Sequence, residues 1–376
     1  MRRSSLLALA CSGAMAATLV AAAPSQAVQR DHAPQTVVDD LVGPLSLAVH
    51  DGSAKITVDQ SFAGIITSVD KKGRTTDLAS YQGTPGAGEV VGVSLGPHGT
   101  YYINTDFAAH SSHVNRIGKK GQVTTVSDDF MAYEDANNPD GDVHYGFTGL
   151  GDECTAQLQS YQDSLGGEGP EAPHLVEYTG ILDSHPYKTA VTRKGDIYVA
   201  DAAANAILKV SGRTGAISTV AVIPPPAPVT VTSELLASSL PGAPDCLVGR
   251  DFVPEPVPTD VEIGRDGMLY VSTLGGGLGE ALPLSSVYQV DPRSGTVRWL
   301  AGDMSGATGL ALLGKDIVVA QMFGGEVSVI HRGSTTAETL FSVAGPSDVE
   351  VHGNRVYATT VDLQSGMGSV VSYKVG

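Results

Sequence analysis

Short runs in which apolar and polar residues alternate recur along the chain. Each run fits a β-strand with one buried face, because successive side chains of a strand point to opposite sides. Six of these runs are followed by a turn and then by a second run of the same kind, which begins with a glycine. The first runs cover residues 45–49, 90–95, 188–191, 260–263, 309–312 and 348–351, and the second cover 52–59, 99–104, 195–201, 267–272, 314–320 and 353–358. The pattern predicts six β-hairpins.

A second glycine turn follows most of these hairpins further along the chain. Examples are Lys72-Gly73-Arg74 and Ser294-Gly295-Thr296, each flanked by strand-like runs. Glycine suits tight turns because it adopts positive φ at little steric cost. Each unit is therefore expected to be a meander of four antiparallel strands, and no helical periodicity interrupts the units outside two long insertions. Six such units predict an all-β fold, a six-bladed β-propeller.

The sixth unit reaches Gly376 after only three strands, so its outer strand must come from elsewhere. Residues 36–41 resemble the outer strand of the fifth unit, residues 339–343, and the same Gly-Pro junction follows both. An unpaired sheet edge invites aggregation, and ring closure removes it. We therefore expect an N-terminal strand to close the last blade. The alternative is a valine-rich tail whose likeness is coincidental.

Two long connections interrupt the repeat, at residues 127–184 and 223–257. Both join the outer strand of one unit to the inner strand of the next, so the alternation of strand direction places them on one face. The first contains residues 151–165, which suit a short helix, and the second is rich in proline, with a helical turn expected from Ser233. Because Cys154 lies in the first and Cys246 in the second, we expect a Cys154–Cys246 disulfide. Two unpaired buried thiols are the alternative.

The first residues indicate export. Met1-Arg2-Arg3 and the apolar run at 6–23 fit a secretory signal peptide with cleavage after Ala27. We therefore expect a secreted, extracellular protein, with residues 1–27 as the signal peptide and 28–376 as one domain. A lipoprotein modified at Cys11 is the alternative, but only five apolar residues lead up to that cysteine.

The charge balance narrows the range of partners. The chain has 23 Lys and Arg against 40 Asp and Glu, a net charge of −17, and loss of Arg2 and Arg3 with the signal peptide makes it −19. An acidic surface repels nucleic acid and anionic lipid and attracts cations. The apolar run is also short for a membrane span. We expect no nucleic-acid partner, no membrane span and a monomer.

Polar residues gather where inner strands begin and second strands end, at the expected mouth of the central channel. The inner strands contribute Ser46, His185, Tyr187, Asp260, Thr308 and Asp348, and the second strands contribute Asp59, Asn104, Asp201 and Gln321. Carboxylates and amides arranged in a ring suit a cation or a polar ligand. The alternative, which we favour for Asp59 and Asp201, is that the side chains bond nearby backbone groups. The ligand-binding candidates are therefore Asp260, Asp348, Asn104, His185, Tyr187 and Gln321.

Three other motifs provide no catalytic residue. Gly92-Val93-Ser94-Leu95-Gly96 matches the nucleophile pattern G-x-S-x-G, but it leads into another strand and not into a helix. The spacing of the histidines does not indicate zinc. Residues 137–142, Asn-Asn-Pro-Asp-Gly-Asp, resemble part of a calcium loop but lack the glycine and distal glutamate positions of an EF-hand, so a solvated turn is predicted.

The segment 195–210, GDIYVADAAANAILKV, resembles an NHL-type propeller repeat. Residues 133–141, 185–187 and 257–259 are similar to segments of the ScyD/ScyE family of secreted six-bladed propellers, and this likeness spans nearly the whole chain beyond residue 27. The wider superfamily, TolB-like in fold, includes calcium-dependent lactonases of the SMP-30 group, which hold the metal in the channel through Glu, Asn and Asp. Those enzymes have a glutamate where the first inner strand begins, and this chain has Gly43-Pro44-Leu45-Ser46 there.

Three functions remain. The first is a non-catalytic propeller that binds a protein, glycan or small molecule on the insertion face, and we favour it because the lactonase glutamate is absent. The second is a calcium-dependent, lactonase-like hydrolase with a metal held by Asp260 and Asp348. The third is an accessory role in extracellular biosynthesis, which only the family resemblance implies. Calcium is the one cofactor that the resemblance indicates.

Overall fold

The computed structural model describes residues 33–50, 55–166 and 173–375. Their strands form seven four-stranded sheets, and the short helices lie in connections between strands. This confirms the predicted all-β architecture. Residues 1–27, the predicted signal peptide, lie outside the described residues. Within the described part of the chain, no helix is long and apolar enough to cross a membrane.

Five sheets are meanders of four strands that follow one another along the chain. The first contains β2 Leu47–Val49, β3 Ile56–Gln60, β4 Ile65–Val69 and β5 Thr75–Ser80; the second contains β6 Gly88–Gly96, β7 Gly99–Asp106, β8 Ser111–Ile117 and β9 Val123–Thr125. The third contains β12 Pro186–Val191, β13 Ile197–Asp201, β14 Ala206–Val210 and β15 Ile217–Val222; the fourth contains β18 Pro258–Ile263, β19 Leu269–Thr273, β20 Ser285–Val290 and β21 Val297–Met304. The fifth contains β22 Ala307–Leu313, β23 Asp316–Gln321, β24 Glu326–Ile330 and β25 Glu338–Ser342.

The sixth sheet joins the two ends of the chain. It contains β26 Pro346–His352, β27 Arg355–Val361, β28 Met367–Lys374 and, at its outer edge, β1 Gln35–Val42. β1 pairs antiparallel with β28, from Gln35 opposite Ser372 to Val42 opposite Met367. The predicted N-terminal strand is therefore confirmed, and it covers the backbone edge of β28 that would otherwise be unpaired.

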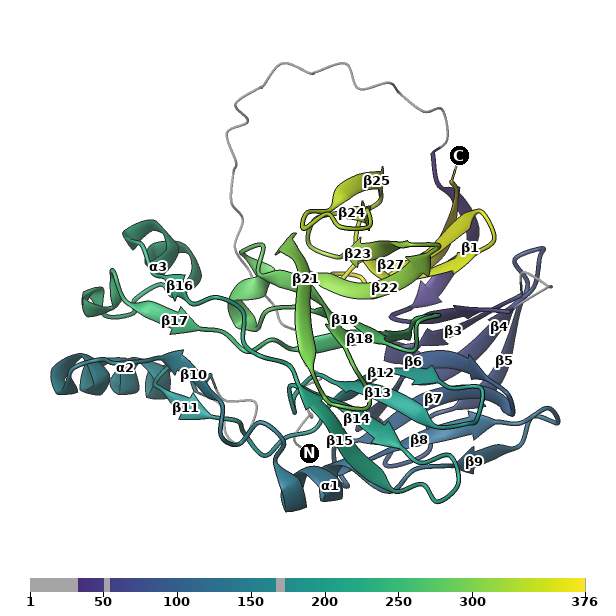
Figure 1. The fold of residues 1–376 in the computed structure, drawn as a ribbon, viewed down its shortest axis with the longest axis horizontal. Coiled ribbons are helices and arrows are strands. Elements are labelled where there is room, and N and C mark those ends of the chain that lie inside the picture. Colours follow the sequence, from purple (N-terminus) through teal and green to yellow (C-terminus); the bar gives the residue numbers. More distant parts are fainter. Residues whose placement is uncertain (1–32, 51–54, 167–172, 376) are drawn as a thin grey trace.

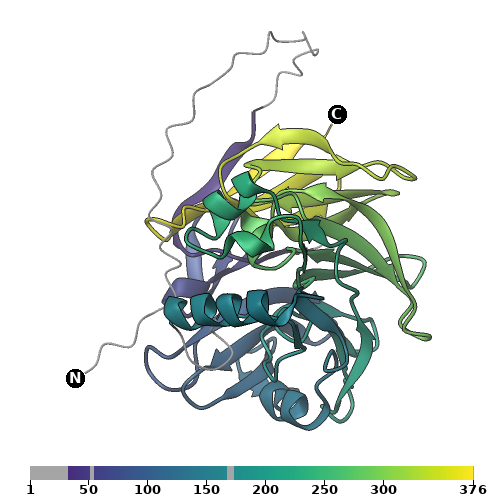
Figure 2. The ribbon, with the colours of Figure 1, turned by 90° about the vertical axis from the view of Figure 1, so that its left-hand side faces the viewer.

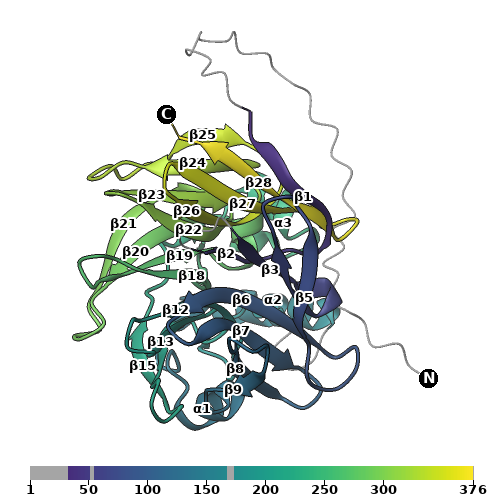
Figure 3. The ribbon, with the colours of Figure 1, turned by 90° about the vertical axis from the view of Figure 1, so that its right-hand side faces the viewer.

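The first strands of these six sheets form a closed ring of contacts. β2 contacts β6 and β26, β12 contacts β6 and β18, and β22 contacts β18 and β26. Figure 3 shows these strands around a common centre, with the last strands of the sheets at the periphery. The core is divided among the spaces between neighbouring sheets: for example, Ile207 of the third sheet packs in one cluster with Val261 and Val271 of the fourth.

The two insertions form one body. The first insertion contains α1 Phe130–Asn137, β10 His144–Phe147, α2 Asp152–Leu165 and β11 Tyr178–Thr179, and the second contains β16 Val229–Thr230, α3 Ser233–Ser239 and β17 Asp251–Val253. β10 pairs with β17, so the seventh sheet, in the order β11-β10-β17-β16, mixes both segments. In Figure 1 the seventh sheet, α2 and α3 project together from one side of the other sheets, whereas α1 lies against β8, and Figure 2 shows α2 crossing in front. The helices expected at 151–165 and from Ser233 are confirmed as α2 and α3, whereas α1 and the seventh sheet were not predicted.

A disulfide joins the two insertions, as predicted. Cys154 in α2 bonds Cys246, 92 residues further along the chain, and their Cα atoms are 5.9 Å apart. Next to this link, the rings of Phe147 and Phe252 pack with centroids 5.1 Å apart, and Leu158 is fully buried. The insertions therefore share a hydrophobic core that also includes Leu278 from the loop between β19 and β20 and that is distinct from the cores between the other sheets.

Candidate functional site

The first strand of several sheets has the same irregularity in its pairing with the second strand. It places one residue of each of these inner strands in a common layer around the centre of the ring. In four of these strands the pairing register shifts just before that residue, between Pro186 and Lys188, Pro258 and Asp260, Ala307 and Gly309, and Pro346 and Asp348. A β-bulge bends the strand and changes the direction of the next side chain. The same shift in each strand therefore brings Lys188, Asp260 and Asp348 to the same depth of the channel.

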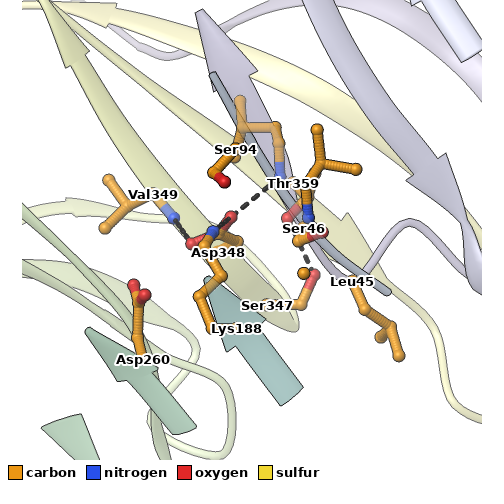
Figure 4. A network of polar contacts seen from close by, with 12 residues as sticks. Leu45, Ser46, Ser94, Lys188, Asp260, Ser347, Asp348, Val349 and Thr359 are labelled. Carbon is orange, nitrogen blue, oxygen red and sulfur yellow. Dashed lines mark hydrogen bonds and ion pairs between the residues drawn. The ribbon is translucent and has the colours of Figure 1, made fainter. Parts of the chain in front are cut away.

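An ion pair spans this layer. The ammonium of Lys188 pairs with Oδ2 of Asp348, and the two side chains are 3% and 2% exposed. Their strands, β12 and β26, are opposite members of the ring of six, so the pair crosses its centre (Figures 3 and 4). Burial opposes the charge of Lys188, but the carboxylates of Asp348 and Asp260 outweigh it and raise the pKa of the ammonium. Lys188 therefore remains protonated at neutral pH.

Every carboxylate oxygen of Asp260 and Asp348 already accepts a hydrogen bond. Oδ1 of each accepts from the backbone N–H of the next residue, at 2.8 Å in Asp348 and 2.7 Å in Asp260. Oδ2 of Asp348 accepts from the N–H of Leu47 at 2.8 Å, and Oδ2 of Asp260 accepts from the N–H of Leu310 at 2.7 Å. Because Leu47 and Leu310 belong to the next sheet in each case, both carboxylates fasten neighbouring sheets to each other.

These contacts do not fit a calcium ion held by Asp260 and Asp348. Lys188 already compensates their charge, and its ammonium would repel a second cation at this place. Where lactonases have a glutamate, Ser46 accepts from the N–H of Val93 at 2.8 Å and donates to Asp59. Among the residues that the structure describes, no three His, Cys, Asp or Glu side chains form a group that could hold a metal ion. The residues present therefore do not support the alternative of a channel calcium ion held by Asp260 and Asp348.

The channel layer is rich in acidic groups. Glu262 and Glu350 lie two residues beyond Asp260 and Asp348 on the same strands, and therefore on the same side. Burial raises the pKa of Asp260 to about 7 and that of Glu350 to about 8, and it also raises the pKa of Glu262. Burial likewise raises the pKa of Asp59 to about 7. The charge of Lys188 lowers these pKa values but does not outweigh burial, so the acids retain protons close to neutral pH.

We expect the free energy of unfolding to decrease as the pH rises from about 5 to about 8. An acid whose pKa is raised by folding binds its proton more tightly in the folded protein, so its contribution is complete at low pH and is lost as the pH passes the folded pKa. Asp59, Asp260 and Glu350 have raised values of about 7, 7 and 8. Each of these groups contributes at most about 1.4 kcal/mol per pH unit to the slope of the free energy of unfolding against pH. Urea unfolding across this interval measures the trend, and a free energy that increases instead would contradict the assignment.

His185 and Tyr187 lie at the start of the inner strand β12, beside the mouth of the channel. The His185 side chain is 36% exposed, and its Nε2 lies 2.6 Å from Oε1 of Glu89. Its ring meets those of Phe107 and Tyr187 edge-on, with centroids 5.8 and 6.1 Å apart. Partial burial opposes the imidazolium, but Glu89 outweighs this and raises the pKa of His185 to about 9. His185 therefore presents a fixed, partly accessible positive charge at the mouth.

The structure does not bring Asn104 and Gln321 into this site. The side-chain amide of Asn104 exchanges two 2.8 Å hydrogen bonds with the backbone of Gln82. Oε1 of Gln321 accepts from the N–H of Ser305 at 2.7 Å, and its Nε2 donates to Ser328 at 2.6 Å. Both side chains fasten the ends of their strands and are already engaged, so a ring formed by all the candidates is not observed.

Asp59 and Asp201 act as expected. Each carboxylate accepts hydrogen bonds from two backbone N–H groups. The donors to Asp59 are Leu45 and Ser46, and the donors to Asp201 are His185 and Ala204. Both are fully buried. Their contacts hold the entry to the inner strand against the end of the second strand, which is a structural role.

The turn at residues 137–142 is solvated only in part, because Asn137 and Asp142 are exposed but Asp140 is buried, which the prediction of a solvated turn did not include. Asp140 is 0% exposed, and its Oδ2 accepts from the hydroxyl of Tyr145 at 3.0 Å and from Nδ2 of Asn205 at 2.9 Å. The preceding helix α1, which the sequence pattern did not indicate, buries Glu134 to 1% exposure. Two acidic groups that sequence reasoning assigned to the surface or did not consider are therefore inside the protein.

Comparison with known proteins shows the fold. No protein-family model and no curated protein matches the chain. Solved structures of similar fold include a PQQ-bound aldose sugar dehydrogenase from Streptomyces coelicolor, 15% identical, which aligns over 90% of this chain and 96% of its own with a TM-score of 0.52. A glucose dehydrogenase from Thermus thermophilus is 16% identical over 91% and 99% of the two chains, with a TM-score of 0.54. A virginiamycin B lyase from Staphylococcus aureus is 14% identical over 91% and 99%, with a TM-score of 0.48. At these identities the likeness concerns architecture and not activity, and the chain is a β-propeller in fold.

Proposed function

We propose that the protein is a secreted six-bladed β-propeller of the ScyD/ScyE type that binds a protein ligand on its insertion face and catalyses no reaction. The closed ring of six inner strands supports six blades, with the seventh sheet as an addition to one face. On this proposal, residues 28–376 form one domain behind a signal peptide at 1–27. The Lys188–Asp348 pair across the centre supports docking on a face in preference to chemistry inside the channel.

The distribution of exposed apolar side chains supports this proposal most directly. Loops between second and third strands lie on the same face as the insertions, because strand direction alternates within each sheet. Ten large apolar side chains of the described residues are exposed. Eight belong to this face: Phe62, Phe107, Phe323, Leu363 and Met367 in or beside the loops, and Leu165, Leu182 and Val248 in the insertions. Exposed apolar side chains gathered on one face are typical of a contact surface.

A recess in this face supports a protein ligand. A hollow of about 570 Å³ lies between the fifth and sixth sheets, and its lining includes Met322, Phe323, Leu363 and Met367. Protein interfaces concentrate their binding energy where an apolar or aromatic side chain fills such a pocket. We therefore expect the partner to insert an apolar side chain between these two blades, while Phe62 and Phe107 extend the contact around the mouth.

We expect the combined change of Phe62, Phe107, Phe323 and Leu363 to Ser to weaken partner binding by about tenfold or more, the loss typical of central interface residues. The matched control, Val123→Ser with Trp299→Ser, removes exposed apolar surface from outer strands. Partners are captured from the medium of producing cells and identified, and their dissociation constants are then measured against both variants. Equal affinity for the two variants would contradict the proposed surface.

A hydrolase is the second candidate, and the His185–Glu89 pair favours it. A fixed imidazolium at an open channel mouth can donate a hydrogen bond to a carbonyl or leaving-group oxygen. The similar solved structures described above are named as enzymes, which makes turnover worth measuring. A calcium-dependent mechanism of the lactonase type would require other ligands than Asp260 and Asp348.

Titration of acid release from a panel of lactones and aryl esters separates the two functions. We expect the same rate for the wild-type protein and for His185→Ala, with both equal to the uncatalysed rate. A rate that the wild-type protein shows and folded His185→Ala lacks would replace the binding function with hydrolysis. A matched control is His98→Ala, which changes an exposed histidine on a turn between strands.

A further inference from the structure

Four buried acceptor oxygens in the first insertion have no hydrogen-bond donor. They are Oε1 and Oε2 of Glu134, Oδ1 of Asn138 and Oδ1 of Asp140. In the described part of the chain, every buried carboxylate oxygen without a partner belongs to Glu134 or Asp140. These two side chains are 1% and 0% exposed, so water does not reach them freely. A buried acceptor without a donor costs free energy, and a charged one costs more.

The three residues that carry these oxygens lie within a segment of seven residues, 134–140. α1 ends at Asn137, and the next residue, Asn138, has positive φ and donates its N–H to the carbonyl of Glu134 at 2.8 Å. Nδ2 of Asn138 donates to the carbonyl of Gly180 at 3.0 Å, which leaves the amide oxygen free. The carboxylate of Asp140 also lies against Gly180, where a Cβ atom would collide with its Oδ1. Asn138 and Asp140 therefore both lie against Gly180, just beyond the end of α1.

The surroundings of Glu134 are strongly negative. Burial, followed by the charges of Asp201, Asp140 and Asp183, raises the pKa of Glu134 to about 8. Burial also raises the pKa values of Asp140, Asp183 and Asp201. Nearby histidines offset the charge of Asp183 in part, because His185 and His110 lower its pKa. The cluster therefore needs either bound protons or a bound cation.

We propose that Glu134, Asn138 and Asp140 bind a calcium ion that fastens the first insertion to the third sheet. Calcium prefers carboxylate and amide oxygens, takes six to eight of them and tolerates water among its ligands. The three residues supply four such oxygens, and the third ligand is an amide, so the site has only two carboxylates. The link to the third sheet runs through Asp140, whose Oδ2 accepts from Asn205 in the loop between β13 and β14. This site is separate from the channel layer and does not depend on the proposed ligand-binding function.

Terbium luminescence tests the site directly. Terbium replaces calcium at oxygen-rich sites and emits when a nearby tyrosine absorbs, and the Tyr145 hydroxyl lies 3.0 Å from Asp140. We expect the chelator-treated protein to show saturable terbium emission that calcium displaces. Glu134→Gln and Asp140→Asn should each lose most of it, whereas Asp135→Asn, which removes an exposed charge from the same helix, should retain it.

Thermal unfolding provides the second readout. Calcium should raise the midpoint of the wild-type protein and of Asp135→Asn by the amount that mass action gives for a specific site, with little effect on Glu134→Gln. Glu134→Gln removes the buried charge, so we expect it to fold and to be at least as stable as the wild-type protein in chelator. The proposal would be overturned if calcium did not raise the unfolding midpoint of the wild-type protein, or if it raised that of Glu134→Gln by the same amount. A response abolished by Asp348→Asn but kept in Glu134→Gln would place the ion in the channel instead.

Discussion

Changing Lys188 to Met is expected to lower the free energy of unfolding by about 3–5 kcal/mol at about pH 8, because it removes one partner of a buried ion pair. Lys188 is 3% exposed, and the neighbouring carboxylates of Asp348 and Asp260 would be left without their cation. At about pH 5 the loss should be smaller, because the raised pKa values allow these acids to take up protons in its place. Urea unfolding at the two pH values measures both effects.

The exposed pair Lys209–Asp196 provides the matched control. Its atoms are 3.0 Å apart, but the side chains are 35% and 34% exposed. Lys209→Met should therefore cost less than about 1 kcal/mol, as exposed ion pairs do. Adding Asp348→Asn to Lys188→Met should recover part of the stability, because it removes one of the uncompensated charges. Equal losses for Lys188→Met and Lys209→Met would show that the channel pair has no special role.

Replacing both Cys154 and Cys246 with Ser is expected to cost about 4 kcal/mol, the entropy that a crosslink over so long a loop removes from the unfolded chain. The bond joins residues 92 positions apart. Because the insertions have a separate core around Phe147 and Phe252, we expect the loss to appear first as local opening of this body.

Hydrogen exchange locates that loss. In the double Ser variant, amides of β10 and β17 should exchange faster than in the wild-type protein, while those of β13 and β19 in the blades should change little. The wild-type protein under reducing conditions should behave like the variant, which serves as a control without any substitution. Unchanged exchange in β10 and β17 would show that the disulfide does not hold the insertions together.

The repeating part of the fold could be predicted because each blade follows one rule. Alternating strands and glycine turns recur at fixed places, and the missing outer strand had a visible counterpart at the N-terminus, which pairs with β28. The insertions follow no such rule. α1 has only eight residues, and β10 and β17 pair between segments far apart in the chain, so their arrangement depends on tertiary contacts that no local pattern indicates.

The polar groups were predicted only in part. Asp260 and Asp348 stood out as acids at the start of strands, but the sequence pattern did not indicate that a lysine would compensate them. Pro186-Tyr187-Lys188 occupies the same place as Pro258-Thr259-Asp260, and comparing these positions could have identified Lys188. Glu134 and Asp140 were harder to find, because their burial depends on the packing of α1 against the second and third sheets.

We infer that an internal ion pair, and not a metal, occupies the middle of the propeller. Crystals grown with terbium, and measured at a wavelength where it scatters anomalously, test this inference. We expect density for Lys188 reaching across to Asp348, no anomalous peak beside Asp260 or Asp348, and a peak beside Glu134 and Asp140. A peak between Asp260 and Asp348, with Lys188 turned away, would contradict the ion pair and identify the channel as a metal site.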